Sequence, residues 1–574
     1  MVADNYWTRP QDRRLGRRHI LRTAGAGGIG LALTVSGCGK SKTKAPVEGN
    51  APAAQGAPKY GGTYQVNPVY GNPPHLDLHA TTSVFSQTVV NYVAGRLMNV
   101  QSAPLDFSVW STAAGTPNLA LSAESPDAVT WTLKLRNDVK WHNIPPVNGR
   151  PFVAEDVKAN WSRALTIKGA VWAASLDMID PTQITTPDDQ TVVLKLKYPF
   201  APFPAILSAT TLGAQYPREA LAGTYDPKQV VIGTGGFVFD HLTPDVEFVA
   251  KKNPDFYLKG QPYVDGMRVP IIPDQSQRLA QFIGGHLDLA QFLPTDVDAV
   301  KRSVPNAQWM VETPGSGEML WLQLGDQTSR FQDIRVRRAL SMAIDRDAIG
   351  KAAYANDYIL GFCPGPSLGP KESLQYNQLP PDTAQYFKYN PSEAKKLLEA
   401  AGAADMQVAI AYPQPYTLAG FIPAAEIVNN FLNQVGVKSV LQQIDYTNVY
   451  LNNGKGYSAG FFPKDVMVFS GIRGGSTQDP DGRLYDYFDS KSLVGAEHLK
   501  DTVLDGMIDK ERTIVNQEER WKACLDIQKY IADKMYMVAF LPQPYNHWAL
   551  QSRVKNYYPY DGGVGPAKLW LDNG

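Results

Sequence analysis

The stretches WTLKLRNDVKWH, residues 131–142, and GRPFVAEDV, residues 149–157, decide the expected fold. Residues 131–135 alternate apolar and polar side chains with a period of two, which is typical of a half-buried strand. The run 152–165 instead repeats its apolar residues at helical spacing. Because strands and helices interleave in this way throughout the chain, the sequence predicts α/β lobes rather than a sandwich or a helical bundle.

Local helix signals elsewhere in the chain support this mixture. Asn390 and Pro391 have the order of a helix start, with asparagine as the cap and proline in the first turn. Asp333 stands before another helical run in the position of a cap. We expect the arginines that follow it, Arg337 among them, to lie on a solvated helix face.

The composition is that of a globular protein and excludes several classes. Lys and Arg number 55 and Asp and Glu number 55, so the formal charge is zero, which disfavours a nucleic-acid partner. Three cysteines exclude a disulfide scaffold and a zinc or iron–sulfur module with many cysteines. Since the sequence has no apolar run of about 18–20 residues, we expect no membrane-spanning helix in the mature protein.

The first 38 residues have the features of an export signal. A basic segment with Arg17 and Arg18 precedes an apolar, glycine-rich run that is too short to span a bilayer. The arginine pair resembles a twin-arginine export signal, and the Val-Ser-Gly-Cys that ends at Cys38 resembles a lipobox, whose cysteine receives the lipid. The alternative is an ordinary Cys38 in a secreted tail. Residues 39–59 follow without an apolar period and predict a flexible tether.

The stretch quoted first resembles the signature of the family 5 extracellular solute-binding proteins, the peptide/nickel/opine-type receptors of bacterial ABC importers. Further pieces follow in the order of that family: GTG (233–235), NPDFY (253–257), PYVDG (262–266), GHLDLA (285–290), FQDIRVRRAL (331–340), AIDR (343–346) and DPD (479–481). The resemblance covers nearly all of Tyr60 to Gly574. Most of these residues suit caps and core, so they identify a fold and do not mark a ligand.

The resemblance implies a two-lobed, periplasmic-binding-protein-like α/β fold of the large peptide-binding type, with a hinge and a ligand cleft between the lobes. Lobe 1 is then discontinuous, with residues 60–314 and a return segment 544–574, and lobe 2 is 315–543. By the same analogy the chain crosses near Val311–Glu318 and near Leu541–Tyr545.

The resemblance also implies a function. Members of the family close on a small organic solute and deliver it to the permease subunits of an ABC importer. No cofactor, no nucleic acid and no catalysis are needed, and the expected state is a monomer. The expected location is the extracytoplasmic face of the cell membrane or the periplasm, with an N-terminal lipid anchor in the membrane.

Three stretches resemble the cleft loops of the family. The first holds Thr82 and Ser83, whose hydroxyls would bond a solute carbonyl or hydroxyl, or would cap a helix. In the second, Gln414 stands where dipeptide binders carry an arginine for the ligand carboxylate, and Tyr416 offers a ring to stack on. The third is SGIRGG, residues 470–475.

The third stretch bears most directly on the ligand. Arg473 and Gly474 offer a cation and close backbone approach, which suits an anionic or polyhydroxylated ligand; a surface arginine is the alternative. Peptide binders carry a tryptophan and then an aspartate for the ligand ammonium, where this chain has Ile472 and Gly475. A buried unpaired charge costs several kcal/mol, which argues against peptides with free termini. The solute class left is a modified peptide, an opine-like conjugate or an oligosaccharide.

Two other functions were weighed. An exported enzyme such as a hydrolase is one, but the sequence has no GxSxG, HExxH or phosphate-binding loop motif. A nickel or haem receptor of the same fold is the other, and the three stretches hold no histidine. His75 and His79 have the spacing of a metal pair on one helix face, or belong to an ordinary loop. Cys363 and Cys524 form a disulfide or remain separate buried thiols.

Overall fold

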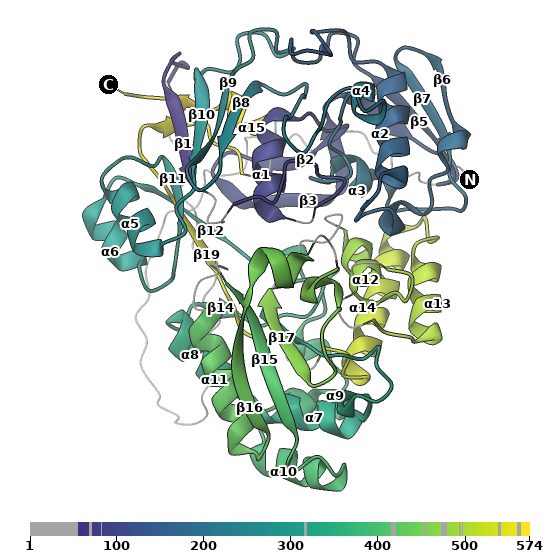
Figure 1. The fold of residues 1–574 in the computed structure, drawn as a ribbon, viewed down its shortest axis with the longest axis vertical. Coiled ribbons are helices and arrows are strands. Elements are labelled where there is room, and N and C mark those ends of the chain that lie inside the picture. Colours follow the sequence, from purple (N-terminus) through teal and green to yellow (C-terminus); the bar gives the residue numbers. More distant parts are fainter. Residues whose placement is uncertain are drawn as a thin grey trace, which may run out of the picture. The chain divides into compact units, whose positions relative to one another are not determined.

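The structure is a computed structural model (Figure 1). It describes residues 56–67, 72–81, 83–314, 318–414, 421–452, 455–471, 479–492, 495, 498–537, 541–559 and 564–573. The export signal, with Arg17, Arg18 and Cys38, lies outside the described residues, as does most of the tether, and these assignments stay predictions. At the end of the tether, residues 56–59 are exposed. None of the helices in the described ranges is long and apolar enough to cross a membrane.

Lobe 1 is built on two sheets. The larger has the strand order β12 (Gln308–Glu312), β19 (Asn546–Leu550), β11 (Leu289–Phe292), β1 (Thr63–Asn67), β10 (Gly266–Pro270), β9 (Glu247–Lys252) and β8 (Phe237–Thr243). The second has the order β4 (Ala120–Glu124), β5 (Thr130–Leu135), β7 (Thr191–Lys195) and β6 (Ile184–Asp188). The described residues of this lobe also form two strand pairs, β2 (Met98–Ala103) with β3 (Asp106–Pro117) and β20 (Val554–Lys555) with β21 (Trp570–Leu571).

The helices of lobe 1 pack around these sheets. They are α1 (Val84–Val93), α2 (Ala154–Thr166), α3 (Phe203–Ser208), α4 (Arg218–Leu221), α5 (Gln275–Ile283), α6 (Val297–Ser303) and α15 (Gly565–Lys568). The stretch quoted first fixes the start of α2. Trp141 donates from Nε1 to Asp156 (3.0 Å), Arg150 donates to the same carboxylate (2.8 Å), and Asp156 also accepts from the backbone of Val153 (3.1 Å). These residues therefore stabilise the start of α2, which is a structural role of the kind that the sequence indicated.

The larger sheet in the described part of lobe 2 has the order β13 (Glu318–Trp321), β17 (Val466–Gly471), β15 (Gln407–Gln414) and β16 (Lys438–Asp445). A short pair joins β14 (Tyr358–Ile359) to β18 (Gln543–Pro544). The helices are α7 (Ile334–Ala343), α8 (Arg346–Tyr354), α9 (Pro381–Ala384), α10 (Pro391–Ala400), α11 (Phe421–Gln434), α12 (Pro480–Phe488), α13 (Thr502–Glu511) and α14 (Gln517–Asp533). Residues 319–541 supply one large cluster of buried apolar side chains, whereas the clusters of lobe 1 come from 64–310 and 549–571.

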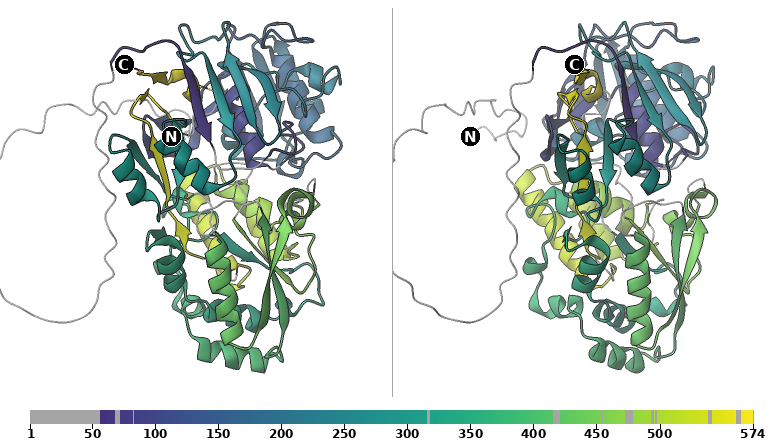
Figure 2. Two further views of the ribbon diagram at one scale, coloured as in Figure 1. Left: turned by 60° about the vertical axis from the view of Figure 1, so that its left-hand side comes forward. Right: turned by 90° about the vertical axis from the view of Figure 1, so that its left-hand side faces the viewer.

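The chain crosses between the two sheets twice. β12 ends at Glu312 in the large sheet of lobe 1, and β13 begins at Glu318 in the sheet of lobe 2. On the way back, β18 pairs with β14, and the next strand, β19, pairs with both β11 and β12 (Figures 1 and 2). The lobe boundaries placed at 314/315 and 543/544 stay predictions.

Several local expectations can be compared with the structure. The strand expected at 131–135 is β5, and the helix expected at 152–165 is α2. Asn390 caps α10 and Asp333 caps α7, each through its side chain. The solvated position expected for Arg337 is wrong. That side chain is buried and donates to the carbonyls of Phe331 (2.6 Å) and Lys534 (2.8 Å), because α7 packs its arginine face against other segments of lobe 2.

Candidate functional site

The candidate site lies at one edge of the sheet in lobe 2. β15 pairs in parallel with β16 and with β17, so the three strands end at the same edge. The segments 415–420 and 472–478 continue from β15 and β17 there, and both lie outside the described residues. Ligands of open α/β sheets bind beyond the carboxyl ends of parallel strands. Two of the three predicted loops thus follow strands that end at an edge where ligands of such sheets bind.

Two unpaired polar groups lie at this edge among the described residues. Gln414, the last residue of β15, has a buried side-chain Nε2 without a hydrogen-bond partner. Ser470, next to the end of β17, is fully buried and its Oγ has no partner either. Buried polar groups are almost always paired, and these two have no partner among the described residues. Solute contact by Gln414 stays a prediction, and Ser470 was missed because its buried position follows only from the strand pairing.

Ser83 caps α1. Its Oγ accepts from the backbone N–H of Ser86 (3.4 Å), and its own N–H donates to Oγ1 of Thr81 (3.1 Å). The capping alternative is thereby observed, while contact of Ser83 with a solute stays a prediction. Four predicted contacts lie outside the described residues: Thr82, Tyr416, Arg473 and Gly474.

A buried group of acids and arginines begins directly after the segment 472–478. Asp479 caps α12 and is held by Arg520, whose Nη1 lies 2.8 Å from one carboxylate oxygen while Nη2 donates to the other. Arg512 lies with Nε 2.9 Å from Oδ1 of Asp481, in a charge contact that lacks hydrogen-bond alignment. Each aspartate at the start of α12 therefore has a buried arginine beside it.

The third acid of the group is Glu511, the last residue of α13. Burial and the neighbouring charge of Asp481 raise the pKa of Glu511 well above its ordinary range. Burial also raises the pKa of Asp481, with which Glu511 shares a hydrogen bond. A hydrogen bond between two carboxyl groups needs one proton, and we assign it to Glu511. Two arginines then balance two carboxylates, so this group presents no free negative charge to a ligand ammonium.

The sequence held no signal for this arrangement beyond the aspartates of DPD. Arg512 and Arg520 lie on elements far along the chain from Asp479 and Asp481, and neither stands in a recognisable motif. Only the packing of α12, α13 and α14 against one another brings the four side chains together.

His79, Cys363 and Cys524 are buried, as is typical of residues with a structural role. His79 is fully buried, shares a hydrogen bond through Nδ1 with Arg163 (2.8 Å), and burial lowers its pKa to about 3. Within the described ranges, no three His, Cys, Asp or Glu side chains are grouped so as to hold a metal ion. Cys363 and Cys524 are both buried and unpaired in the structure. Burial raises the pKa of the Cys363 thiol to about 12 and that of Cys524 as well, so neither is an activated nucleophile.

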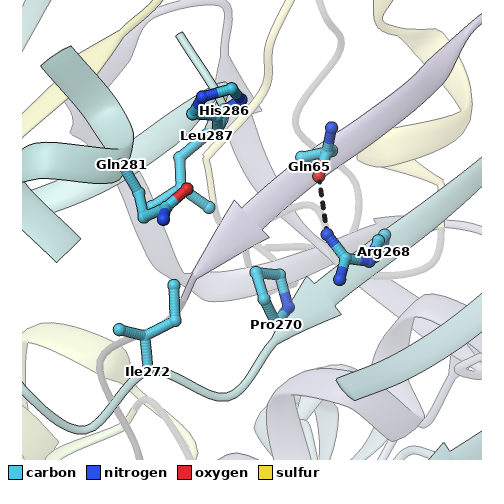
Figure 3. A pocket seen from close by; sticks show the side chains of 7 residues that line it. All are labelled: Gln65, Arg268, Pro270, Ile272, Gln281, His286 and Leu287. Carbon is cyan, nitrogen blue, oxygen red and sulfur yellow. Dashed lines mark hydrogen bonds between the residues drawn. The ribbon is translucent and has the colours of Figure 1, made fainter. Parts of the chain in front are cut away.

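A pocket of about 390 Å³ lies elsewhere, in lobe 1. Residues of β1, β10 and the segment around α5 line it (Figure 3): Gln65, Arg268, Pro270, Ile272, Gln281, His286 and Leu287. Arg268 donates to Gln65 (3.1 Å) and is ion-paired with Glu247, so its charge is already balanced. Neither Gln414 nor Ser83 lines this pocket.

Comparisons with known proteins agree with this fold. The family described as bacterial extracellular solute-binding proteins, family 5 (middle part), matches residues 115–493. That match covers well over half of the chain, which therefore belongs to the family 5 bacterial extracellular solute-binding proteins. A putative ABC transporter peptide-binding protein of Brucella ovis is 29% identical over 379 residues, which are 62% of this chain and 65% of that protein. The match thus spans less than two thirds of this relative's length.

Solved structures show the same fold. A periplasmic binding protein of A. tumefaciens R10 in complex with agropinic acid has a TM-score of 0.74 and 24% identity, covering 89% of this chain and 99% of that one. The oligopeptide-binding protein AppA of Bacillus subtilis with a nonapeptide has a TM-score of 0.75 and 20% identity, covering 90% of this chain and all (100%) of that one. The expected two-lobed α/β fold is confirmed.

Proposed function

We propose that this chain is an extracytoplasmic receptor that binds an organic solute by hinge closure of its lobes and delivers it to the permease of an ABC importer. The observation that carries the proposal is the family membership over residues 115–493. The site at the carboxyl edge of β15 and β17 supports it, since both strands lead directly into loops that the family places in its cleft. The receptor acts as a monomer and without turnover of the solute.

We propose an anionic or polyhydroxylated solute: an opine-like conjugate, a modified peptide or an oligosaccharide. Arginines already balance the aspartates at the start of α12, so the described part of the site offers no carboxylate to a ligand ammonium. Arg473 adds a cation in the sequence segment that precedes them. A group without partners, such as Nε2 of Gln414, is suited to a neutral acceptor on the solute.

A thermal-shift screen of the purified chain tests this function. The panel contains opine-like conjugates in which a secondary amine links a sugar to an amino acid, di- and tripeptides with free and with blocked termini, oligosaccharides, haem and nickel–histidine. We expect a conjugate, blocked peptide or oligosaccharide to raise the melting temperature, because a ligand that binds only the folded state stabilises it by mass action. Mass spectrometry should recover it unchanged. A shift with haem or nickel–histidine alone, or conversion of the bound solute, would overturn the proposal.

We further propose that the receptor is exported through Arg17 and Arg18 and anchored by lipid at Cys38. Two or three acyl chains hold a protein firmly at a membrane, whereas one chain does not. Cys38→Ala should release the protein from the membrane fraction and change its processing. A variant that still partitions with membranes and is cut at the same site contradicts the anchor and leaves solute binding untouched.

A further inference from the structure

Arg512 occupies an unusual position for an arginine that follows the end of a helix. Its side chain is 2% exposed, and it lies between elements of both lobes. On the side of lobe 2, Nε lies 2.9 Å from Oδ1 of Asp481, and the guanidinium carbon lies 4.0 Å from the ring centre of Tyr485. Both partners belong to α12, the helix that begins just after the candidate segment 472–478.

Lobe 1 covers the other side of the same guanidinium. Its carbon lies 4.7 Å from the ring centre of Phe200. Nη1 lies 3.7 Å from Oδ1 of Asp177 and 3.5 Å from the hydroxyl of Tyr198. The backbone takes part as well, because the N–H of Ala201 donates to the carbonyl of Arg512 (3.0 Å). We call this set of interactions the Arg512 contact.

A second polar contact between the lobes involves the same helix. The hydroxyl of Ser175 donates to Oδ1 of Asp486 (2.7 Å), and both side chains are buried. Two contacts thus connect α12 with lobe 1. The Arg512 contact reaches α12 through Asp481 and Tyr485, and the hydrogen bond from Ser175 reaches it through Asp486.

We propose that Arg512 is a positioning residue that holds α12 of lobe 2 against lobe 1, so that contact between the lobes depends on its guanidinium. Cation–π contacts and ion pairs gain strength when water is excluded, and Arg512 has both in a nearly dry setting. Separation of the lobes would remove Phe200, Tyr198 and Asp177 from the guanidinium and expose it to water. The contact therefore favours the closed arrangement without touching the solute.

This inference rests on the proposed function, because it treats the two lobes as bodies that move apart and together about a hinge. Family membership alone does not predict that one arginine, Arg512, favours the closed arrangement before any solute binds. The populations of open and closed protein should then change when either side of the contact is altered.

Single-molecule energy transfer on the full chain without solute tests the inference. Dyes are placed at Leu121→Cys in lobe 1 and Val440→Cys in lobe 2, which are 50% and 62% exposed, in a Cys38→Ser background. Cys363 and Cys524 are buried and will not compete for dye. Arg512→Gln should raise the ratio of the open, longer-distance population to the closed one about tenfold or more, because charge-assisted interactions are lost.

A second variant, in lobe 1, tests the same contact in case Arg512→Gln misfolds lobe 2. Asp177→Asn changes only lobe 1, where the carboxylate is partly exposed, and should raise the same ratio about twofold to fivefold. Arg335→Gln is the matched control, since this exposed arginine is ion-paired with Asp333 in its own lobe and should change nothing. If Arg512→Gln and Asp177→Asn both stay within twofold of wild type with unchanged circular dichroism, the inference is wrong. The experiment uses no solute, so a failed thermal-shift screen would refute the proposed function independently.

Discussion

Two of the places where the described residues join the lobes, the crossing strands and the Arg512 contact, differ in construction. At the crossing strands, Glu312 at the end of β12 accepts from Nδ2 of Asn546 (3.1 Å) and Nε1 of Trp548 (2.9 Å) on β19, and Nε2 of His547 shares a hydrogen bond with Asp357 of lobe 2. Here the two segments of the chain also share a ladder of main-chain hydrogen bonds. At the Arg512 contact, the lobes share side chains and one backbone bond.

This difference indicates which joint can open. Separating β12 from β19 would break a sheet in the core of lobe 1, whereas the Arg512 contact can be parted with both lobes intact. We therefore expect the crossing strands to act as the hinge and the Arg512 contact to be made and broken. Variants at the first joint should change the free energy of unfolding, and variants at the second should change the populations of open and closed protein.

The largest effect is expected at Arg520, in the buried group of acids and arginines beside the Arg512 contact. Arg520→Leu leaves Asp479 as a buried, uncompensated charge, so the free energy of unfolding should fall by about 3–5 kcal/mol. Urea denaturation measures it. Lys529→Ala on the same helix is the control, because its exposed ion pair with Asp526 should contribute less than about 1 kcal/mol. A loss at Arg520 no larger than that at Lys529 would contradict the buried group.

The proton on Glu511 gives the next effect, and it depends on pH. The pKa of Glu511 is raised in the fold, so the folded chain keeps a proton that the unfolded chain loses above its ordinary pKa. Stability therefore falls as the pH rises from that value towards the raised pKa. Glu511→Gln removes this loss and should be more stable than wild type, by up to about 1.4 kcal/mol for each pH unit crossed. Denaturation at pH 5 and pH 8 measures the difference; an advantage that does not grow with pH would place the proton elsewhere.

At the hinge, a smaller loss of stability is expected. Glu312→Ala removes the acceptor of two side-chain donors on β19, which should lower the free energy of unfolding by about 1–3 kcal/mol. The open and closed populations of the folded protein should stay as in wild type. Glu426→Ala, at an exposed site on α11, is the control for loss of a carboxylate. A shift in the populations without loss of stability would reverse the roles that we assign to the two joints.

The smallest effect concerns Ser83, which belongs to neither joint. Loss of the α1 cap in Ser83→Ala should cost about 1 kcal/mol of stability. If Ser83 also contacts the solute, as predicted, calorimetry with the solute found by screening should show affinity reduced about threefold or more. Unchanged affinity beside the loss of stability would leave Ser83 as a helix cap alone.

The sequence predicted the parts of the fold that depend on neighbours in the chain. The alternation at 131–135 and the helical spacing at 152–165 correspond to β5 and α2, because period and side-chain type are local properties. Arg337 was misplaced, since its charge suggested water while the packing of α7 gave it buried carbonyl partners. The order of family motifs predicted the two lobes, which local patterns alone would not have done.

The site was less predictable, for a physical reason. The placement of Gln414 at the carboxyl edge of β15 fits its predicted role, but Tyr416, Arg473 and Gly474 lie outside the described residues. Contacts such as those of Arg512 join residues that are hundreds of positions apart. No periodicity reports such a contact, because it depends on how separate helices and lobes pack.

Small-angle X-ray scattering of the full chain, with and without the solute that the thermal-shift screen identifies, tests the central claim most directly. The account predicts a smaller radius of gyration when solute is bound, because the lobes close about the crossing strands. It also predicts that the solute is recovered chemically unchanged. A radius that stays the same at saturating solute, or a product in place of the solute, would contradict a receptor that works by closure.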